Sequence, residues 1–138
     1  MSALRPTAVL VVDDDANHAW IARLVLDALA PGLPVEVCID AAAAREAIGG
    51  LPRGALVLMD RRLGGVETFD TVVDCRSRRP DVPVVMLSAM FTSIDRAYAI
   101  ACGARDAIEK PSTLAEWRSV LGVLIAADAP APRVSRAA

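Results

Sequence analysis

The sequence has few aromatic residues and no long apolar segment. Aromatic residues make up 4% of the 138-residue chain against 54% hydrophobic residues, so a core must be built mainly from Val, Leu and Ile. None of the apolar runs approaches the roughly 20 residues that a membrane span needs. The N-terminus also lacks the basic-then-apolar layout of a signal peptide. We therefore expect a cytoplasmic location and no membrane partner.

Cysteine and net charge are low as well. The chain has three cysteines and no CxxC pair, so neither a disulfide framework nor a zinc site is indicated, and we expect reduced thiols. The formal net charge is −2, from 17 acidic and 15 basic residues, which does not favour a nucleic-acid partner. We expect a monomer or a weak dimer. The cysteines are Cys38, Cys75 and Cys102.

The length predicts one domain, in which short apolar runs alternate with segments of helical period. Such alternation predicts a doubly wound α/β fold, with parallel strands, right-handed crossovers and helices on both faces of the sheet. We place this domain at residues 7–127 and expect residues 128–138, rich in Ala, Pro and Arg, to be a disordered tail. The predicted strands are Ala8–Val12, Val35–Ile39, Ala55–Met59, Val84–Leu87 and a short one around Ala107–Ile108.

Helix starts are marked by residues whose side chains accept backbone hydrogen bonds. Apolar positions recur at three- and four-residue spacing, so each helix has one face suited to the core. The predicted caps are Asp15 or Asn17, Asp40, Ser93, and Thr113 with Glu116; the predicted stops are Pro31-Gly32, Gly49-Gly50, Pro80 and Gly103; and the predicted core positions include Leu24, Val73 and Ile94.

Polar residues follow four of the predicted strands. Asp13 and Asp14 follow the first strand, Asp60 the third, Ser88 the fourth and Lys110 the fifth. Because ligands bind outside the carboxyl ends of the strands in such a sheet, we expect these side chains to converge at one edge. Ser88 as a turn residue and Lys110 as a solvated cation are structural alternatives. However, Lys110 is the only lysine of the chain beside 14 arginines, which favours a function.

Three converging carboxylates repel one another unless a cation neutralises them. A hard divalent ion such as Mg²⁺ takes oxygen ligands of this kind, together with waters and a phosphoryl oxygen. A lysine and a serine beside it supply charge neutralisation and hydrogen-bond donors for a phosphoryl group in transfer. Since a carboxylate can itself be the nucleophile, the set predicts phosphoryl transfer to an aspartate.

These polar residues strongly resemble those of the receiver domain of bacterial two-component response regulators, the CheY-like family. The similarity covers residues 7–127. It implies a flavodoxin-like (βα)5 fold with a five-stranded parallel sheet in the order 2-1-3-4-5. By this resemblance Asp60 is the phospho-acceptor, Ser88 and Lys110 are its catalytic partners, and Pro111 is a cis-proline.

The resemblance also implies a Mg²⁺ cofactor. By the family pattern, Asp13, Asp14 and Asp60 are its side-chain ligands, and the backbone carbonyl of Arg62 is a further ligand. The backbone N–H groups of Arg62 and Ala89 then face the oxygens of the phosphoryl group.

The chain departs from the family pattern at several positions. Ala107 stands at the aromatic switch position, so we expect activation to reorganise the neighbouring face only slightly. Arg62 and Met90 lie two residues beyond the acceptor and beyond Ser88, and we expect them to modulate the lifetime of the phosphoryl group. The other departures are Leu63-Gly64 in place of Met-Pro and Ser112 in place of an aromatic residue.

The resemblance predicts a single-domain response regulator rather than an enzyme, although it catalyses its own phosphoryl transfer and dephosphorylation. The phosphoryl group comes from the phosphohistidine of a sensor kinase or a histidine phosphotransfer protein, and output runs through protein contacts. Only about a dozen residues follow the last predicted helix, too few for an output domain.

Three other functions share parts of the pattern. A haloacid-dehalogenase-type phosphatase would use Asp13 as nucleophile and Asp15 as general acid, but the chain is short for that class and lacks a second acidic pair late in the sequence. A flavodoxin-type cofactor binder needs a Ser/Thr/Gly-rich loop where this chain has three acids. A degenerate receiver would act only as an interaction module. The aspartate that carries phosphate separates the phosphatase from the receiver.

Overall fold

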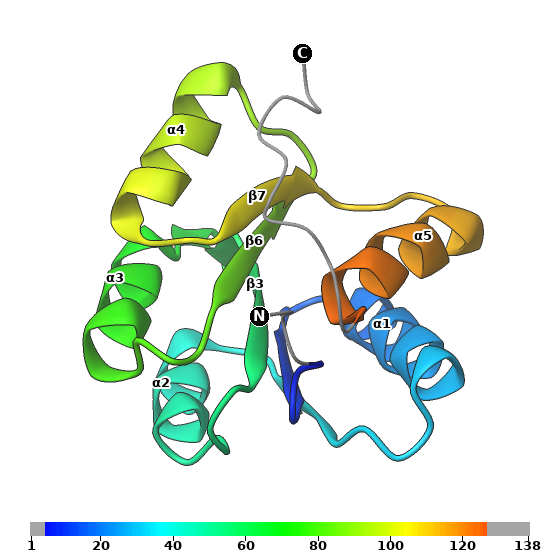
Figure 1. Cartoon of the computed structure of the whole chain (residues 1–138). Coiled ribbons are helices and arrows are strands. Elements are labelled where there is room, and N and C mark those ends of the chain that lie inside the picture. Colours follow the sequence, from blue (N-terminus) through cyan, green and yellow to red (C-terminus); the bar gives the residue numbers. More distant parts are fainter. Residues whose placement is uncertain (1–4, 127–138) are drawn as a thin grey trace.

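Five parallel strands form a sheet in the spatial order β2-β1-β3-β6-β7, which confirms the expected flavodoxin-like order 2-1-3-4-5 (Figure 1). The computed structural model describes residues 5–126. The strands are β1 (Val9–Val12), β2 (Val35–Cys38), β3 (Leu56–Asp60), β6 (Val84–Ser88) and β7 (Asp106–Glu109), and the helices are α1 (Ala16–Leu29), α2 (Ala41–Gly49), α3 (Phe69–Arg78), α4 (Ser93–Cys102) and α5 (Leu114–Ile125).

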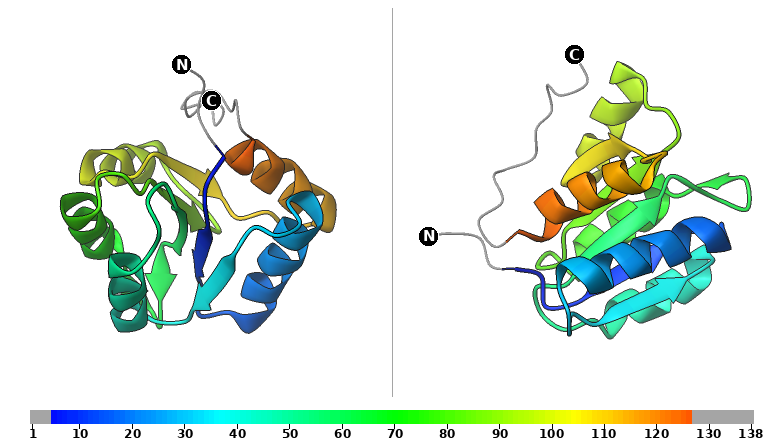
Figure 2. Two further views of the ribbon diagram at one scale, coloured as in Figure 1. Left: turned by 60° about the horizontal axis from the view of Figure 1, so that its bottom comes forward. Right: turned by 90° about the vertical axis from the view of Figure 1, so that its right-hand side faces the viewer.

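The sheet separates two apolar clusters because successive side chains of a strand point to opposite faces. In β1, Leu10 and Val12 belong to the cluster beneath α2, α3 and α4, whereas Val9 and Val11 belong to the cluster beneath α1 and α5. Figure 2 shows α1 and α5 lying side by side on their face of the sheet. The central strands β1, β3 and β6 are buried on both faces, as their continuous apolar runs predict.

Three of the predicted helix caps are confirmed, but the cap of α4 lies one residue earlier than predicted. Asp15, Asp40 and Thr113 accept backbone N–H bonds at the starts of α1, α2 and α5. In α4 the cap is Thr92, whose side chain accepts the N–H of Asp95 while the Asp95 carboxylate accepts the N–H of Thr92. This reciprocal pair fixes the start of the helix, so Ser93 is already helical.

Three residues predicted to face the core are exposed: Leu24, Val73 and Ile94. In α1 the buried positions are instead filled partly by alanines, Ala19 and Ala22, beside Val25 and Leu26. The apolar period therefore locates the helices correctly but does not rank their apolar residues by burial.

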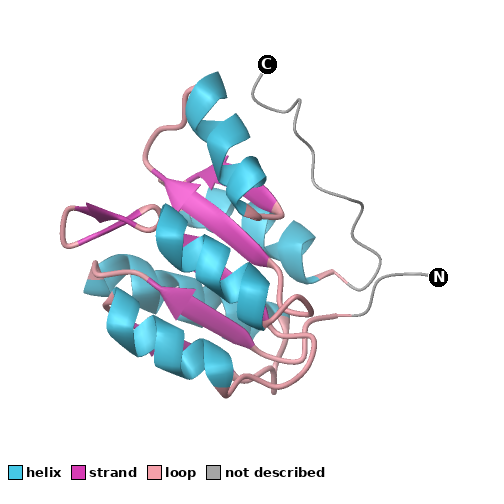
Figure 3. Cartoon of the chain, turned by 90° about the vertical axis from the view of Figure 1, so that its left-hand side faces the viewer, coloured by secondary structure: helices cyan, strands magenta, loops and turns pink. Residues whose placement is uncertain are grey.

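A small hairpin that the sequence did not predict follows β3. Its strands, β4 (Arg62–Leu63) and β5 (Val66–Glu67), pair antiparallel, and the hairpin extends beyond the main sheet (Figure 3). Its two-residue turn is Gly64-Gly65, both with positive φ, as the favoured two-residue hairpin turns require. The departure from Met-Pro, Leu63-Gly64, therefore lies in this hairpin.

Three further expectations concern the cysteines, membrane spans and the C-terminal tail. Cys38, Cys75 and Cys102 are free thiols. None of the helices among residues 5–126 is long and apolar enough to cross a membrane. The proposed tail, residues 128–138, lies outside the described residues.

Candidate functional site

Asp13, Asp14 and Asp60 lie together at the carboxyl edge of the sheet. The pairing of Val12 with Met59 places the ends of β1 and β3 side by side, so the residues that follow converge. One carboxylate oxygen from each of the three acids lies within 4.8 Å of the others. Asp13 is buried, Asp60 is half-buried and Asp14 is exposed. The edge therefore concentrates negative charge at one point.

Lys110 brings the matching positive charge from the end of β7. Its backbone N–H donates to the carbonyl of Ser88, which fixes the chain just beyond the paired strands β6 and β7. Nζ lies 2.9 Å from Oδ2 of Asp13 and 3.2 Å from Oδ2 of Asp60. With only 12% of its side chain exposed, this ammonium is enclosed by the carboxylates rather than solvated.

Burial and the opposite charge of the partner shift the pKa values of Asp60 and Lys110 in opposite directions. Burial raises the pKa of Asp60, and the nearby Asp13 carboxylate adds to this, while Lys110 opposes it. Burial by itself would lower the pKa of Lys110, but hydrogen bonds and charge from Asp13 and Asp60 outweigh it, so the pKa of Lys110 is raised. The ammonium is therefore held in its charged form by the acids that it neutralises.

Backbone donors fix the three carboxylates. The N–H of Asp15 donates to Oδ1 of Asp13 at 2.8 Å, and the N–H of Gly64 donates to Oδ2 of Asp14 at 2.7 Å. The N–H of Arg62 points to Oδ1 of Asp60 at 3.4 Å. The turn of the β4–β5 hairpin is thus tied to the acidic edge.

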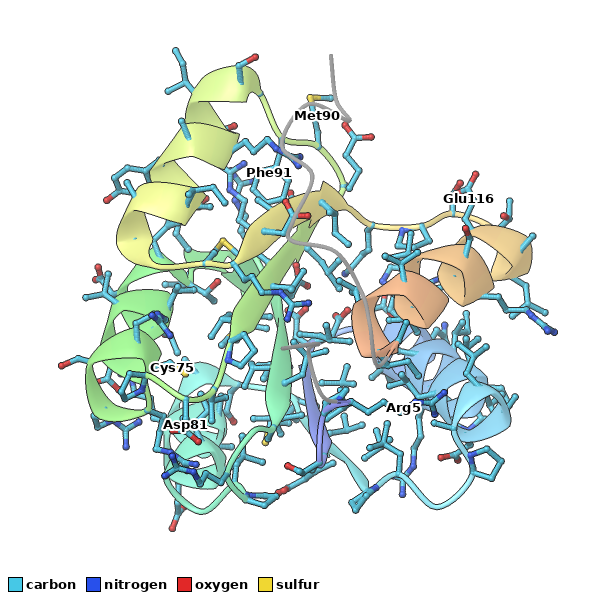
Figure 4. All side chains as sticks on the ribbon, in the orientation of Figure 1. Arg5, Cys75, Asp81, Met90, Phe91 and Glu116 are labelled. Atoms are coloured by element: carbon cyan, nitrogen blue, oxygen red, sulfur yellow. The ribbon has the colours of Figure 1, made fainter. Side chains whose placement is uncertain are left out.

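Ser88 is bonded within its own loop. Its Oγ donates to the carbonyl of Met90 at 2.9 Å and accepts the N–H of Met90 at 3.3 Å. Met90 is 68% exposed and lies with Phe91 between β6 and α4, near the upper end of the molecule in Figure 4. Ser88 therefore ends β6 and Ala89 follows it at the same edge as Asp60, and their roles toward a phosphoryl group stay predictions.

Arg62 does not lie over the carboxylates of the site. Its guanidinium forms an ion pair with Glu67 across the hairpin, where the two residues are register partners, and 61% of its side chain is exposed. Its expected effect on the lifetime of a phosphoryl group stays a prediction, as does that of Met90.

The prediction that Pro111 is a cis-proline is wrong. Residues 5–126 contain no cis peptide bond, so the bond between Lys110 and Pro111 is trans. The trans form is favoured by about 0.5–1 kcal/mol before proline. Lys110 reaches Asp13 and Asp60 with this bond trans, so these contacts do not require the cis form.

Sequence reasoning missed two arginines whose side chains are largely buried near the site strands, Arg61 and Arg96. Arg61, directly after Asp60, pairs with Glu67 at 3.0 Å and with Asp95 of α4 at 3.1 Å, and its guanidinium lies over the rings of Phe69 and Phe91. Only 13% of this side chain is exposed. Its position next to Asp60 was a signal in the sequence, but nothing there showed the direction of the side chain.

Arg96 occupies the region around the switch position Ala107. It forms a buried ion pair with Asp106 at 2.9 Å and donates to the carbonyl of Ala107. Ala107 itself is fully buried. A charged α4 side chain therefore contacts the strand at the place where the family carries an aromatic ring.

His18 is a further residue that sequence reasoning missed. Its Nδ1 lies 3.2 Å from Nζ of Lys110. It is the only histidine of the chain, and it lies in the first turn of the helix that follows Asp13 and Asp14. Its place near the acidic edge could have been inferred from that spacing.

The donor set fits a divalent cation. Asp13, Asp14 and Asp60 offer only oxygen ligands, and one ammonium leaves a surplus of negative charge among them. Mg²⁺ prefers such ligands and usually binds through one or two carboxylates. The residues therefore match the ion that the resemblance implies.

Comparisons with known sequences agree with this geometry. A family model described as the response regulator receiver domain matches residues 9–121. The DNA-binding response regulator MtrA of Mycobacterium tuberculosis is 39% identical over 105 residues, which cover 75% of this chain and 43% of MtrA. The transcriptional regulatory protein PrrA of the same species is 34% identical over 109 residues, covering 78% of this chain and 45% of PrrA. The chain spans less than half the length of these relatives.

Solved structures share the fold. The receiver domain of NtrX from Brucella abortus has a TM-score of 0.70 and 29% identity, with 85% of this chain and 97% of that chain covered. A CheY-like receiver domain protein from Methanospirillum hungatei JF-1 has a TM-score of 0.72 at 21% identity, covering 84% of this chain and 90% of that chain. The second likeness concerns the fold alone.

Proposed function

This chain belongs to the receiver domain family of two-component response regulators, and we propose that it accepts a phosphoryl group on Asp60. Members of this family are phospho-acceptor signalling domains. The donor that we propose is the phosphohistidine of a sensor kinase or of a histidine phosphotransfer protein. The observation that carries the proposal is the convergence of Asp60 with Asp13 and Lys110 at one edge of the sheet.

In the proposed step, a carboxylate oxygen of Asp60 attacks phosphorus. The new P–O bond forms as the P–N bond to the donor histidine breaks, and the electron pair of that bond returns to the histidine nitrogen. Lys110 faces the Asp60 oxygen and supplies positive charge to the phosphoryl oxygens. The backbone N–H groups of Arg62 and Ala89 are the proposed further donors.

Asp13, Asp14 and Asp60 would hold Mg²⁺, with the carbonyl of Arg62 as the proposed further ligand. When bound, the ion neutralises charge on the phosphoryl group in transfer. Lys110 supplies charge on the side of Asp13 and Asp60, and Gly64 orients Asp14.

The local contacts favour Asp60 over Asp13 as the nucleophile. The buried Asp13 carboxylate accepts short hydrogen bonds on both oxygens, at 2.9 Å from Lys110 and 2.8 Å from the N–H of Asp15. The contacts to the half-buried Asp60 are longer, at 3.2 Å from Lys110 and 3.4 Å from the N–H of Arg62, so its oxygens are held less tightly. The Asp15 carboxylate accepts the N–H groups of Asn17 and His18 as the cap of α1, so it is engaged where the phosphatase would need a general acid. The phosphatase is therefore the weaker candidate.

Mass spectrometry after incubation with acetyl phosphate and Mg²⁺ tests the proposal. We expect one phosphoryl group on Asp60, no labelling of Asp60→Asn, and unchanged labelling of the control Asp27→Asn, which alters an exposed acid on α1. Labelling of Asp13, or undiminished labelling of Asp60→Asn, would show that the phosphatase is the better description.

Output is the least constrained part of the proposal. We propose that the phosphorylated domain signals through protein contacts. MtrA and PrrA are named as DNA-binding and transcriptional regulators. The absence of a nucleic-acid partner, the single-domain organisation and the cytoplasmic location therefore stay predictions for this chain.

A further inference from the structure

The ammonium of Lys110 meets three acceptors. Nζ lies 2.9 Å from Oδ2 of Asp13, 3.2 Å from Oδ2 of Asp60 and 3.2 Å from Nδ1 of His18. An ammonium has three N–H donors and no acceptor, so each contact takes one donor. Nδ1 of His18 must then be the acceptor, which places the proton of a neutral imidazole on Nε2.

Two other residues position the imidazole of His18. Asp15, the cap of α1, accepts the backbone N–H of His18 at 3.3 Å. The ring of Trp117 on α5 lies next to the imidazole, with 6.5 Å between ring centroids. The Asp15 carboxylate is 3.5 Å from Nδ1, farther than the ammonium. A protonated Nδ1 could donate to Asp15 but would point its proton at the ammonium of Lys110. Because Lys110 is the closer of the two, its contact favours an unprotonated Nδ1.

We propose that His18 is a positioning residue that holds the ammonium of Lys110 for phosphoryl transfer, an inference that rests on the proposed function of Asp60. When Asp60 bonds to phosphorus, the ammonium must exchange the Asp60 oxygen for an oxygen of the phosphoryl group. Asp13 and His18 hold two of its three donors throughout this exchange. The third donor therefore stays directed at the reacting oxygens, which is the orientation that transfer requires.

A neutral acceptor suits this position better than a fourth acid would. Another carboxylate would add negative charge beside Asp13 and Asp60 and would draw the ammonium away from the phosphoryl group. The imidazole accepts one hydrogen bond and adds no charge. Without it, a largely buried ammonium has a donor that only water can satisfy, and its position becomes less defined.

Nitrogen NMR spectroscopy of the full chain tests the hydrogen bond directly. The single lysine and the single histidine make both side-chain signals unambiguous. We expect an unprotonated Nδ1 and a protonated Nε2 in His18, and an ammonium signal of Lys110 that exchanges slowly with water. In His18→Leu this exchange should accelerate about tenfold, whereas His18→Asn, which keeps an acceptor near the same place, should retain slow exchange.

Two results would overturn the inference. A proton on Nδ1 would show that the ring serves Asp15 instead of Lys110. Unchanged exchange of the Lys110 signal in His18→Leu would show that the imidazole does not hold the ammonium. Thermal unfolding of both variants confirms that they are folded before either result is used.

Phosphorylation rates test the consequence. With acetyl phosphate and saturating Mg²⁺, we expect His18→Leu to label about tenfold more slowly, and His18→Asn and the control Trp20→Leu to stay within about twofold of the unaltered chain. Trp20 is an exposed residue on the same helix. Equal rates for His18→Leu and the unaltered chain refute the role of His18, whereas an unaltered chain that takes no phosphate on Asp60 refutes the proposed function itself.

Discussion

Asp81, in the loop between α3 and β6, shows how a single ionised residue contributes to the fold far from the acidic edge (Figure 4). The guanidinium of Arg79 donates to both of its carboxylate oxygens at 3.1 Å, and the N–H of Gly54 donates to one of them. These hydrogen bonds, those of Arg79 foremost, lower the pKa of Asp81 to about 2. The ionised form therefore stabilises the folded state above the ordinary pKa, and this contribution is lost as the pH falls toward 2.

We predict that Asp81→Asn lowers the free energy of unfolding at neutral pH and that its difference from the unaltered chain shrinks below the ordinary pKa of 3.8, down to about 2. Urea unfolding at a series of pH values measures this difference. Asp27→Asn, on the exposed face of α1, serves as the control. A difference that stays constant across this pH range contradicts the prediction.

At the residue scale, the sequence predicts the position of a functional side chain best when its residue lies at the end of a strand. Asp60 is the last residue of its strand, and Asp13 and Lys110 directly follow theirs, so parallel pairing alone brings them together. His18 reaches Lys110 from α1 and Arg96 reaches Ala107 from α4, and the direction of each side chain depends on how its helix packs. Sequence period locates such a helix, but it does not fix the direction in which a long polar side chain extends.

Among the elements, α4 is tied through Arg61 to the hairpin that follows β3. This side chain joins Glu67 of the hairpin to Asp95, which also closes the capping box of α4. We predict that Arg61→Ala lowers the free energy of unfolding by about 1–3 kcal/mol, because it leaves Asp95 and two ring faces without their cation and leaves Glu67 with Arg62 alone. The first turn of α4 should also exchange its amide hydrogens faster.

Hydrogen exchange followed by mass spectrometry measures the local effect, and denaturant unfolding measures the global one. Arg118→Ala, an exposed arginine on α5, is the matched control and should change neither. If the amide hydrogens of α4 exchange as slowly in Arg61→Ala as in the unaltered chain, the contact between Arg61 and Asp95 has no stabilising role.

The contact between α4 and β7 leads to a second prediction at this scale. Arg96 binds the carbonyl of Ala107 and the carboxylate of Asp106, and Ala107 has no ring to move. We predict that BeF₃⁻ with Mg²⁺ shifts the NMR signals of residues 88–91 strongly and those around Ala107 only slightly. Large shifts centred on Ala107 and on α4 would show that this face responds to activation without an aromatic residue.

Elements with a clear period were predictable, and the shortest ones were not. Strands β1, β3 and β6 contain continuous apolar runs, β2 alternates apolar and polar residues, and the order of the strands follows from the resemblance. Strands β4 and β5 have two residues each, too few to show any period, and Gly64-Gly65 alone marked the turn. The cap of α4 was misplaced because Thr92 and Ser93 are both suitable caps, and only the bond to Asp95 separates them.

For the molecule as a whole, binding of a cation at the acidic edge should stabilise the fold. We predict that Mg²⁺ raises the unfolding temperature, since an ion that binds only the folded chain stabilises it by about 2.7 kcal/mol at a hundredfold excess over Kd. Asp14→Asn should lose most of this shift because it removes one of the converging carboxylates.

Calorimetry with and without EDTA measures the shift. Asp27→Asn should keep the full response, and Ca²⁺ in place of Mg²⁺ reports how selective the site is. An equal response from Asp14→Asn and the unaltered chain would exclude Asp14 as a ligand.

The single lysine has a consequence for the reactivity of the whole surface. Every other basic side chain apart from the histidine is an arginine, so the chain has one side-chain amine, and the carboxylates of Asp13 and Asp60 enclose it. Acylating and glycating reagents attack unprotonated, accessible amines, whereas the pKa of Lys110 is raised and only 12% of its side chain is exposed. The side chains of the protein are therefore inert toward amine chemistry as long as the two acids hold Lys110.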